Sequence, residues 1–451
     1  MRYLFLFVLL SFQLACESRQ EADLVLLNGK VFTYTWSDPA GDGTPAVDAP
    51  YQNGILQPDA EAIALRDGKT LIAGSRNDVE QYIAETTQVI DVQGGAVIPG
   101  LVDSHTHVAG LGAKLERVDL TDAKNEMAAV ALVAARAKET PAGEWIIGQG
   151  WDEGAWASNY PDKKLLTAKA PDHPVLMQSL HGFAAWGNQM ALDRAGIDAS
   201  TKSPVGGEIR KDANGNPTGL FLNRATNLLT SAVPAPTHEQ IKKRLLAGLQ
   251  EMARSGYVMV HEAGVDSEHL KALQELQAEG KLPIRVYAML SARDEPLIRD
   301  WIARSAWQSD DNMLFVRSVK AYYDGALGSR GARLLEAYSD KPGHFGISGE
   351  GYGFNQEIVA EIMKAGFQAG VHAIGDAGNR ETLNFFEKVF AEIPEARRNR
   401  HRIEHAQVLH PDDFARFKEL QIIASMEPPH AVEDKTWAED RLGPQRIKHA
   451  Y

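Results

Sequence analysis

The chain has 451 residues, of which 44% are hydrophobic, with 39 Gly and 21 Pro, a composition typical of a folded protein long enough for a large domain and a smaller one. Its 47 basic and 60 acidic residues give a net charge of -13, which argues against a nucleic-acid partner bound through its phosphates. A single cysteine excludes an intrachain disulfide and a cysteine-rich zinc site.

Residues 1–16 have the pattern of an export signal. Met1 and Arg2 give a positive start, and an almost wholly apolar stretch leads to Cys16. The stretch is too short to span a membrane as a stable helix. Leu14-Ala15-Cys16 is similar to the lipobox of bacterial lipoproteins, although Gln13 stands where an aliphatic residue is usual. We expect an exported bacterial protein, periplasmic or anchored by a lipid on Cys16. Plain cleavage of the leader, or a cysteine with no role, is the alternative.

The next part of the chain, residues 17–95, is expected to form a small β domain. Residues 22–33 and 62–75 alternate apolar and polar side chains, and they contain Asn-Gly and Asp-Gly turn signals. Short alternating strands joined by tight turns favour an antiparallel sheet.

From residue 96 to 451 the pattern changes to strand followed by helix, repeated, which predicts parallel strands with crossover helices. The apolar run Ala96-Val97-Ile98-Pro99 precedes "GLVDSHTHVAG", and we interpret it as a buried strand that ends at His105 and His107. Residues two apart in a strand point to the same side, so both imidazoles are placed to converge on one metal ion.

The clearest helix begins after Thr237, which forms a capping box with Gln240 and leads to a strand at 257–260. Further helices are predicted at 267–279, 295–304, 356–369, 379–391 and 412–420, and further strands at 284–290, 314–321, 370–373, 402–405 and 422–426.

Counting the strand before His105 as the first, Lys320 falls on the fourth strand, His372 on the fifth and His405 on the sixth. All lie near carboxyl ends, where a (β/α)8 barrel builds its active site. A lone histidine is more often a hydrogen-bonded structural residue than a ligand, and the shared register is what favours the functional interpretation.

Five segments in order resemble the amidohydrolase superfamily, and within it amidohydrolase family 3 (YtcJ-like): "VIPGLVDSHTH", "GEIRKDANGNPTGLF", "VKAYYDGALGSRGARL", "GVHAIGDAGNR" and "RIEHAQVLHPDD". The resemblance runs from about residue 22 to residue 451. It implies an α/β fold, a TIM-like (β/α)8 metallo-hydrolase barrel over residues 96–451 with an insertion at about 108–235. It also implies that residues 17–95 contribute to a small β-sandwich.

The resemblance further implies one or two divalent metal ions, usually zinc, held by His105, His107, His372 and His405. Lys320 would occupy the bridging position as a carbamate, because an unmodified protonated lysine repels a cation. The alternative for Lys320 is a salt bridge with Asp324 or Glu404, which would leave a site for one metal.

These residues suit hydrolysis. Neutral imidazoles hold a divalent cation without cancelling its charge, and the cation lowers the pKa of water from about 15.7 towards 7. We predict a metal-dependent hydrolase that uses this activated hydroxide on C–N bonds, other than peptide bonds, in small molecules, with Lys320, His372 and His405 in catalysis. An ester, lactone or phosphotriester hydrolase, an inactive scaffold and a solute-binding lipoprotein are the alternatives.

The resemblance also implies an aspartate at the end of an eighth strand, acting as the base. No eighth strand follows "SMEPPHAVEDKTWAEDRLGPQRIKHAY", so we expect a chain truncated before that strand and before its return to the small domain. Such a chain is itself expected to be less active or inactive. Asp376 and Glu427 are interpreted as structural or supporting residues rather than substitutes for the aspartate.

Four further residues are candidates for contact with a small-molecule substrate: Trp151, His181, His261 and Arg330. Packing is the alternative for Trp151 and His261, and a salt bridge for Arg330, which otherwise suits bidentate binding of a carboxylate. Asp103 is placed to orient one of the two nearby histidine rings. A homodimer is left open.

Overall fold

The structure is a computed structural model that describes residues 20–451, apart from 41–42, 153–155, 157–159, 181 and 348. The chain divides into two compact units, Met1–Leu101 and Val102–Tyr451. The leader with Cys16, and also His181, lie outside the described residues. Within the described ranges, no helix has both the length and the apolar character needed to cross a membrane.

The smaller unit is built from short strands and one helix, namely β1 (Leu24–Leu27), β2 (Lys30–Val31), β3 (Tyr51–Gln52), β4 (Ile55–Leu56), β5 (Ala62–Arg66), β6 (Lys69–Gly74), α1 (Arg76–Glu80), β7 (Gln88–Asp91) and β8 (Ala96–Val97). Its main sheet has the order β6-β5-β1-β7, while β2 pairs with β8 and β3 with β4. Along β1 the side chains of Val25 and Leu27 are buried, and they pack with Ala62 and Ala64 of β5. The alternation in the sequence therefore places one face of this sheet in a small core.

The larger unit contains the predicted barrel. Its strands are β9 (Leu101–Thr106), β16 (Tyr257–Val265), β17 (Arg285–Ser291), β19 (Leu314–Tyr322), β20 (Gln368–Ala373), β21 (Arg402–His405) and β22 (Ile423–Ser425). They are neighbours in chain order from β9 to β22, and the pairs from β16 to β22 are parallel. The short strand β18 (Trp307–Gln308) lies antiparallel on β19. The sheet is a nearly closed parallel barrel, which confirms the predicted fold class.

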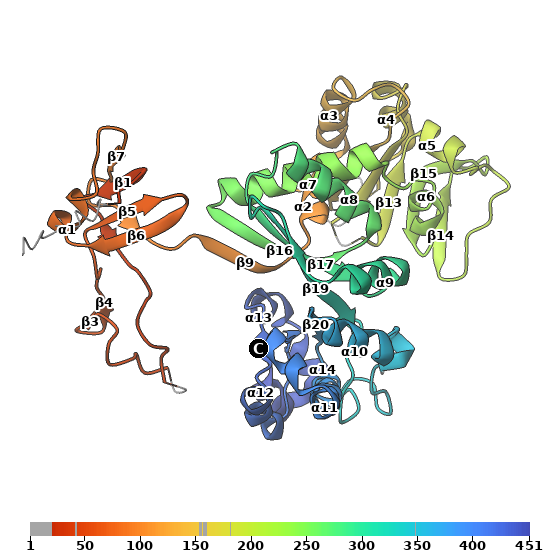
Figure 1. Cartoon of the computed structure of the whole chain (residues 1–451). Helices are drawn as coiled ribbons and strands as arrows, with labels where there is room; N and C mark the ends of the chain where they lie inside the picture. The colour runs from red at the N-terminus through yellow and green to blue at the C-terminus, as the bar shows by residue number, and fades with distance from the viewer. Residues whose placement is uncertain (1–19, 41–42, 153–155, 157–159, 181, 348) are drawn as a thin grey trace, which may run out of the picture. The chain divides into compact units, whose positions relative to one another are not determined.

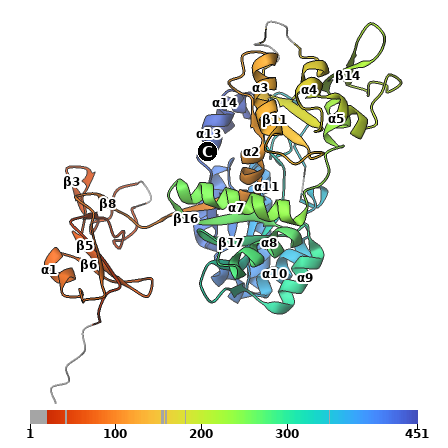
Figure 2. The same cartoon turned by 90° about the horizontal axis from the view of Figure 1, so that it is seen from above.

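Helices connect these strands, as Figure 1 and Figure 2 show. They are α2 (Val108–Glu116), α7 (His238–Arg254), α8 (Ser267–Ala278), α9 (Glu295–Arg304), α10 (Gln356–Lys364), α11 (Asp376–Glu392), α12 (Phe414–Leu420), α13 (Pro429–Asp434) and α14 (Ala438–Arg446), with short 3-10 turns η1 (Gly349–Tyr352), η2 (Pro394–Asn399), η3 (Pro411–Asp413) and η4 (Ile447–His449). The capping box of Thr237 and Gln240 is present at the start of α7. The helix predicted to continue to residue 369 ends at Lys364, because Gly366 adopts a φ of 88° and turns the chain into β20.

The helix that follows His107 packs closely on α7. A Cβ at Gly112 of α2 would lie 1.9 Å from the carbonyl oxygen of Arg244, and one at Gly248 of α7 would lie 2.4 Å from the carbonyl oxygen of Val108. Only glycine permits backbones to approach this closely. The close packing fixes α2, and with it the turn that carries His107.

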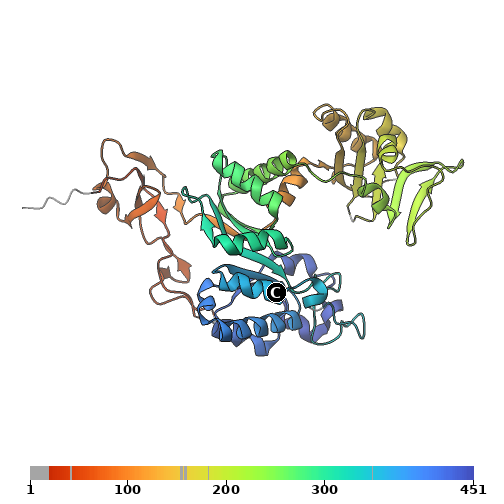
Figure 3. The same cartoon turned by 45° about the vertical axis from the view of Figure 1, so that its right-hand side comes forward.

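Between α2 and α7 the chain forms an inserted α/β lobe, coloured brown to yellow-green in Figure 3. Its elements are β10 (Val118–Asp119), α3 (Glu126–Ala137), β11 (Ile146–Trp151), α4 (Lys163–Lys169), β12 (Val175–Ser179), β13 (Ala184–Gly187), α5 (Gln189–Arg194), β14 (Gly207–Lys211), β15 (Pro217–Asn223) and α6 (Thr226–Thr230). The sheet has the order β10-β11-β12-β13-β15-β14. The first three strands are parallel and the others antiparallel.

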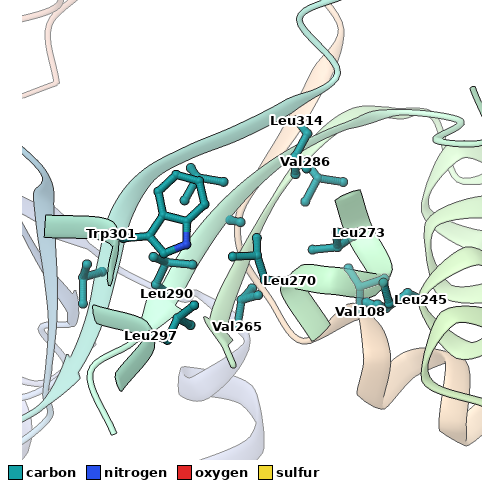
Figure 4. Close-up of a cluster of buried hydrophobic side chains, with 14 of the residues drawn as sticks. Val108, Leu245, Val265, Leu270, Leu273, Val286, Leu290, Leu297, Trp301 and Leu314 are labelled. Carbon is teal, nitrogen blue, oxygen red and sulfur yellow. The ribbon is translucent and has the colours of Figure 1, made fainter. Parts of the chain in front are cut away.

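The core of the barrel's first half is shown in Figure 4. Leu245 of α7 and Leu273 of α8 meet Val286, Leu290 and Leu314 from the strands, and all five are fully buried. Burying a side chain of this size contributes roughly 1.5–3 kcal/mol. This helix-on-sheet core holds the strands whose carboxyl ends carry the candidate site.

One sequence interpretation is wrong. The run at residues 96–99 is not the strand that ends at the histidines, because Ala96–Val97 is β8 and pairs with β2 in the smaller unit. Pro99 lacks a backbone N–H and interrupts the run, so the histidine-bearing strand β9 begins at Leu101. Leu101 and Val102 are 47% and 48% exposed, and β9 is therefore not a buried strand.

Candidate metal centre

Four histidines converge at the carboxyl ends of the strands. The rings of His105 and His405 have centroids 4.9 Å apart, and those of His372 and His405 lie 4.4 Å apart. His107 caps α2 just after β9, with its ring centroid 5.5 Å from that of His105. The structure thus brings together imidazoles from three strands and one strand-to-helix turn that are separated by up to 300 residues in sequence.

His105 is held by a buried hydrogen bond to a carboxylate. Its Nδ1 lies 2.6 Å from Oε2 of Glu404, so Nδ1 donates and Nε2 carries the lone pair. Arg402 grips the same carboxylate with two hydrogen bonds of 2.7 Å. Although burial alone would raise it, the pKa of Glu404 falls to about 2 because His105 and Arg402 stabilise its charge.

Arg402 also forms hydrogen bonds with residues of three other strands of the barrel. Its guanidinium donates to the carbonyl oxygen of Ser104 on β9, to Oγ of Ser425 on β22 and to Nδ1 of His261 on β16. One buried side chain therefore links four strands around His105.

The turn carrying His107 is fixed by Glu262 of β16. This fully buried carboxyl accepts a hydrogen bond of 2.6 Å from the backbone N–H of Val108 and a longer one, 3.3 Å, from Oγ1 of Thr106. Burial raises the pKa of Glu262 to about 7. The residues on both sides of His107 are thus held by one side chain.

Glu427 and His430 complete the cluster from the segment after β22. Oε1 of Glu427 lies 2.7 Å from Nδ1 of His405 and 3.5 Å from Nδ1 of His105. Nε2 of His430 lies 3.3 Å from Nδ1 of His405. A cavity of about 270 Å³ opens beside His405, Glu427 and His430. His105, His405 and Glu427 form a group whose ligand atoms all lie within 4.8 Å of one another.

Lys320 lies beside this group, next to His105. Its side chain is 1% exposed, and Nζ is 3.4 Å from Nε2 of His105. Burial lowers the pKa of Lys320 to about 8. Neither Asp324 nor Glu404 pairs with Nζ in the described structure, so the salt bridges considered for Lys320 do not form.

The backbone at His405, the last of the predicted ligands in the sequence, is strained. His405 and Ala406 have φ values of 73° and 43°, in the left-handed region that β-strand residues avoid. Conformations of this kind cost about 1–3 kcal/mol each and persist where surrounding structure imposes them, often at functional sites. The kink aims the His405 ring at the other histidines.

The residues present fit a divalent cation. Nε2 of His372 is buried, forms no hydrogen bond among the described residues and lies 3.5 Å from Oδ1 of Asp324. Oε1 of Glu427 is also buried, and it contacts Nδ1 of His405 at 2.7 Å. Burial and the neighbouring charges of His405 and Lys320 lower the pKa of His372 well below its usual value, which keeps the ring neutral. A buried ring nitrogen without a hydrogen bond, neighbouring imidazoles and a carboxylate oxygen together form a donor set that zinc and similar ions bind.

Three of the other predicted contacts do not fit. Trp151 is 0% exposed and packs with Trp156 and Trp186 in the core of the insertion, so it cannot touch a substrate. Arg330 forms two hydrogen bonds with Asp340, of 3.1 and 2.7 Å, which is the salt-bridge alternative. His261 stacks on Tyr287 and accepts a hydrogen bond from Arg402. In each case the side chain already packs against, or forms hydrogen bonds with, neighbouring residues of the protein.

The remaining predicted residues have local roles. The Asp103 carboxylate accepts from the backbone N–H of His105 at 3.1 Å and not from a ring. Asp376 accepts backbone N–H groups from Leu335 and Ala377, which agrees with the structural role expected for it.

Sequence reasoning missed the place of Glu404 beside His105 and of Glu427 and His430 beside His405. A signal existed for the first, because Glu404 directly precedes His405 and residues at neighbouring strand positions share a barrel end. None existed for the others, since they follow β22 in a segment without strand periodicity.

A barrel with histidines, a buried lysine and carboxylates at the carboxyl ends of its strands defines the metal-dependent hydrolase class. Residues 88–451 match the Amidohydrolase family, and the chain belongs to that family. Its sequence is 31% identical over 402 residues to YtcJ of Bacillus subtilis (strain 168), covering 87% of this chain and 74% of that protein.

Two further proteins are similar. An N-substituted formamide deformylase of Arthrobacter pascens is 25% identical, covering 73% of this chain and 62% of that enzyme. The crystal structure of an uncharacterized metal-dependent hydrolase from Pyrococcus furiosus superimposes with a TM-score of 0.71 at 26% identity, covering 95% of this chain and 81% of the other. The family resemblance read from the sequence is confirmed, and the protein is a hydrolase of this family.

Proposed function

We propose that the protein hydrolyses a C–N bond, other than a peptide bond, in a small amide, with a divalent cation held by His105, His107, His372 and His405. The observation that carries this proposal is the buried Nε2 of His372, which lacks a hydrogen-bond partner and faces the His405 ring in the same cluster. The similarity to an N-substituted formamide deformylase supports an amide as the substrate.

In this reaction the oxygen of water bonds to the acyl carbon, the C–N bond breaks, and the nitrogen leaves with a proton from that water. A divalent cation, when bound, supplies the positive charge that lowers the pKa of water to about 7 and polarises the acyl oxygen. The protein's own contribution is to keep the histidine rings neutral and to orient their nitrogen atoms towards the cation. Glu404 fixes the tautomer of His105, and Glu262 fixes the turn at His107.

Zinc is proposed as the cation because imidazole suits it and the family usually holds it. We also propose that Lys320 carries a carbamate. Its amine is buried and without a carboxylate partner among the described residues, and its lowered pKa makes available the neutral form that reacts with carbon dioxide. Intact-protein mass measured with and without bicarbonate tests this. A carbamate adds the mass of one carbon dioxide, and its absence in Lys320→Ala locates it.

Metal analysis tests the function first. The purified protein is expected to contain zinc or another divalent ion, and His105→Ala and His372→Ala are expected to lose most of it. His410→Ala, on the surface, is the matched control. Metal content that is equal in all four proteins would contradict the proposal. Release of amine from a panel of small amides, esters and lactones then decides which bond is cleaved.

Export remains a separate proposal. The leader pattern supports secretion and a lipid on Cys16. Labelling with a radioactive fatty acid in a bacterial host is expected to mark the wild-type protein and not Cys16→Ala.

A further inference from the structure

Arg293 is a cation on the catalytic end of the barrel that no carboxylate neutralises. It follows β17, whose carboxyl end is Ser291, and its side chain is exposed. Its guanidinium carbon lies 3.9 Å from the ring centre of Tyr322 and 5.5 Å from that of Tyr352. Among the described residues no Asp or Glu pairs with it. Stacking on two rings holds the guanidinium in place and leaves its N–H groups at the edge free to donate.

The same tyrosine borders the candidate metal centre. Lys320 Nζ lies 5.6 Å from the Tyr322 ring centre, and the Tyr322 and His372 rings have centroids 6.1 Å apart. Tyr322 and His372 are also register partners on β19 and β20. The Arg293 guanidinium is therefore separated from the predicted ligands by a single aromatic ring.

The Tyr322 hydroxyl adds a second donor. No residue in the described ranges forms a hydrogen bond with it, and it is seated against Gly264 of β16. A Cβ at Gly264 would lie 2.8 Å from this oxygen, and Gly264 has a φ of 93°, so only glycine suits the position. The phenol is thus positioned by the barrel wall while its hydrogen-bonding group stays available.

Arg330 differs from Arg293 because it pairs with a carboxylate of the protein. The sequence left two roles open for Arg330, a substrate carbonyl or carboxylate and a salt bridge, and Asp340 forms the salt bridge. In a chain with a net charge of -13, a guanidinium that pairs with no acidic residue beside a hydrolytic centre is available to an anion from outside.

We propose that Arg293 and Tyr322 bind the carboxylate of the substrate, so that the amide hydrolysed at this centre carries a carboxylate on the amine side or the acyl side. This inference rests on the proposed function, because it places an anionic group of that substrate one ring away from the reacting bond. A fixed guanidinium forms two parallel hydrogen bonds with a carboxylate, and the phenol O–H donates a third.

A matched pair of substrates isolates the carboxylate. N-acetylalanine and N-isopropylacetamide share the acetyl amide, and they differ in a carboxylate replaced by a methyl group. The wild-type protein loaded with zinc is expected to favour N-acetylalanine, and Arg293→Gln to raise the KM for it roughly 10- to 100-fold. Because N-isopropylacetamide has no carboxylate, the ratio of the two KM values, and with it the preference for N-acetylalanine, is expected to fall by the same factor in this variant. Arg304→Gln, a surface arginine that also stacks on a ring, is the control.

A binding measurement separates this inference from the proposed function. In metal-free protein, N-acetylalanine is expected to raise the midpoint of thermal unfolding, and Arg293→Gln and Tyr322→Phe are expected to reduce that rise. If neither amide is cleaved but this protection depends on Arg293, the proposed function fails and the carboxylate site stands. If amides are cleaved equally by wild type and Arg293→Gln, and protection is also equal, the inference is overturned while the function stands. Equal protection by inorganic phosphate would overturn the assignment to a carboxylate.

Discussion

Oε2 of Glu404 lies 2.6 Å from Nδ1 of His105, and both side chains are almost wholly buried, at 0% and 4% exposure. The pair joins the sixth strand of the barrel to the first, and Arg402 holds the carboxylate from its other side. A histidine that donates from one nitrogen is oriented to coordinate with the other. This relationship makes Glu404 the residue that sets the direction of the first predicted ligand.

Glu404→Gln is expected to weaken binding of zinc by roughly 10- to 100-fold, because the amide neither fixes the His105 tautomer nor balances Arg402. Competition with a chromophoric chelator measures the affinity. Glu433→Gln, an exposed acid nearby, is the control. Removing one partner of a buried ion pair also costs about 3–5 kcal/mol, so the affinity is measured only on protein shown to be folded by circular dichroism. Equal zinc affinity in folded wild type and Glu404→Gln would contradict this role.

Glu427→Gln is expected to lower metal affinity as well, by at least roughly 10-fold, since one anionic oxygen is lost from the group formed with His105 and His405. The neighbouring His430→Ala is expected to have a smaller effect, because its ring contacts Glu427 and His405 from outside that group. Isothermal titration with zinc ranks the two variants. The reverse order would show that His430, not Glu427, is the ligand.

Glu262 makes the stability of the protein depend on pH. Burial raises its pKa in the folded protein to about 7, above the value of 4.5 for an exposed glutamate. The folded state therefore binds this proton more tightly than the unfolded state does. The contribution of Glu262 is fully present below pH 4.5 and is lost as the pH rises through 7.

Glu262→Gln removes that titration. Relative to the variant, the wild-type protein is expected to lose roughly 3 kcal/mol of unfolding free energy between pH 4.5 and pH 8. Urea unfolding at a series of pH values measures the difference. Glu239→Gln, at an exposed helix start, is expected to show no such slope. Parallel curves for Glu262→Gln and wild type would mean that folding does not change the pKa of Glu262.

Trp151→Ala is expected to destabilise the protein by about 3–5 kcal/mol, because it leaves a cavity among three packed indoles. Trp307→Ala, where the side chain is 39% exposed, is expected to cost much less. Chemical unfolding followed by circular dichroism compares them. A stable Trp151→Ala protein with a selectively raised KM would restore the substrate-contact role that the structure argues against.

The order of strands and helices in the barrel was predictable because apolar periodicity and capping residues are local. The capping box of Thr237 and Gln240 predicts the start of α7, and the alternation of apolar residues in β1 predicts its buried face. The placement of Lys320, His372 and His405 on the fourth, fifth and sixth strands followed from counting these elements, since parallel strands bring their carboxyl ends to one edge. The exception was the run at 96–99, where Pro99 divides two strands that the apolar pattern joined.

The sequence by itself determined the class of fold, the family and the histidines that meet at one end of the barrel. The tertiary structure alone decided which polar groups were already satisfied. Asp340 pairs with Arg330, and neighbouring indoles surround Trp151. By contrast, Arg293 pairs with no carboxylate among the described residues, and Nε2 of His372 forms no hydrogen bond there. The physical reason is that hydrogen bonds and burial depend on contacts between residues far apart in the chain, and a sequence pattern does not show these contacts.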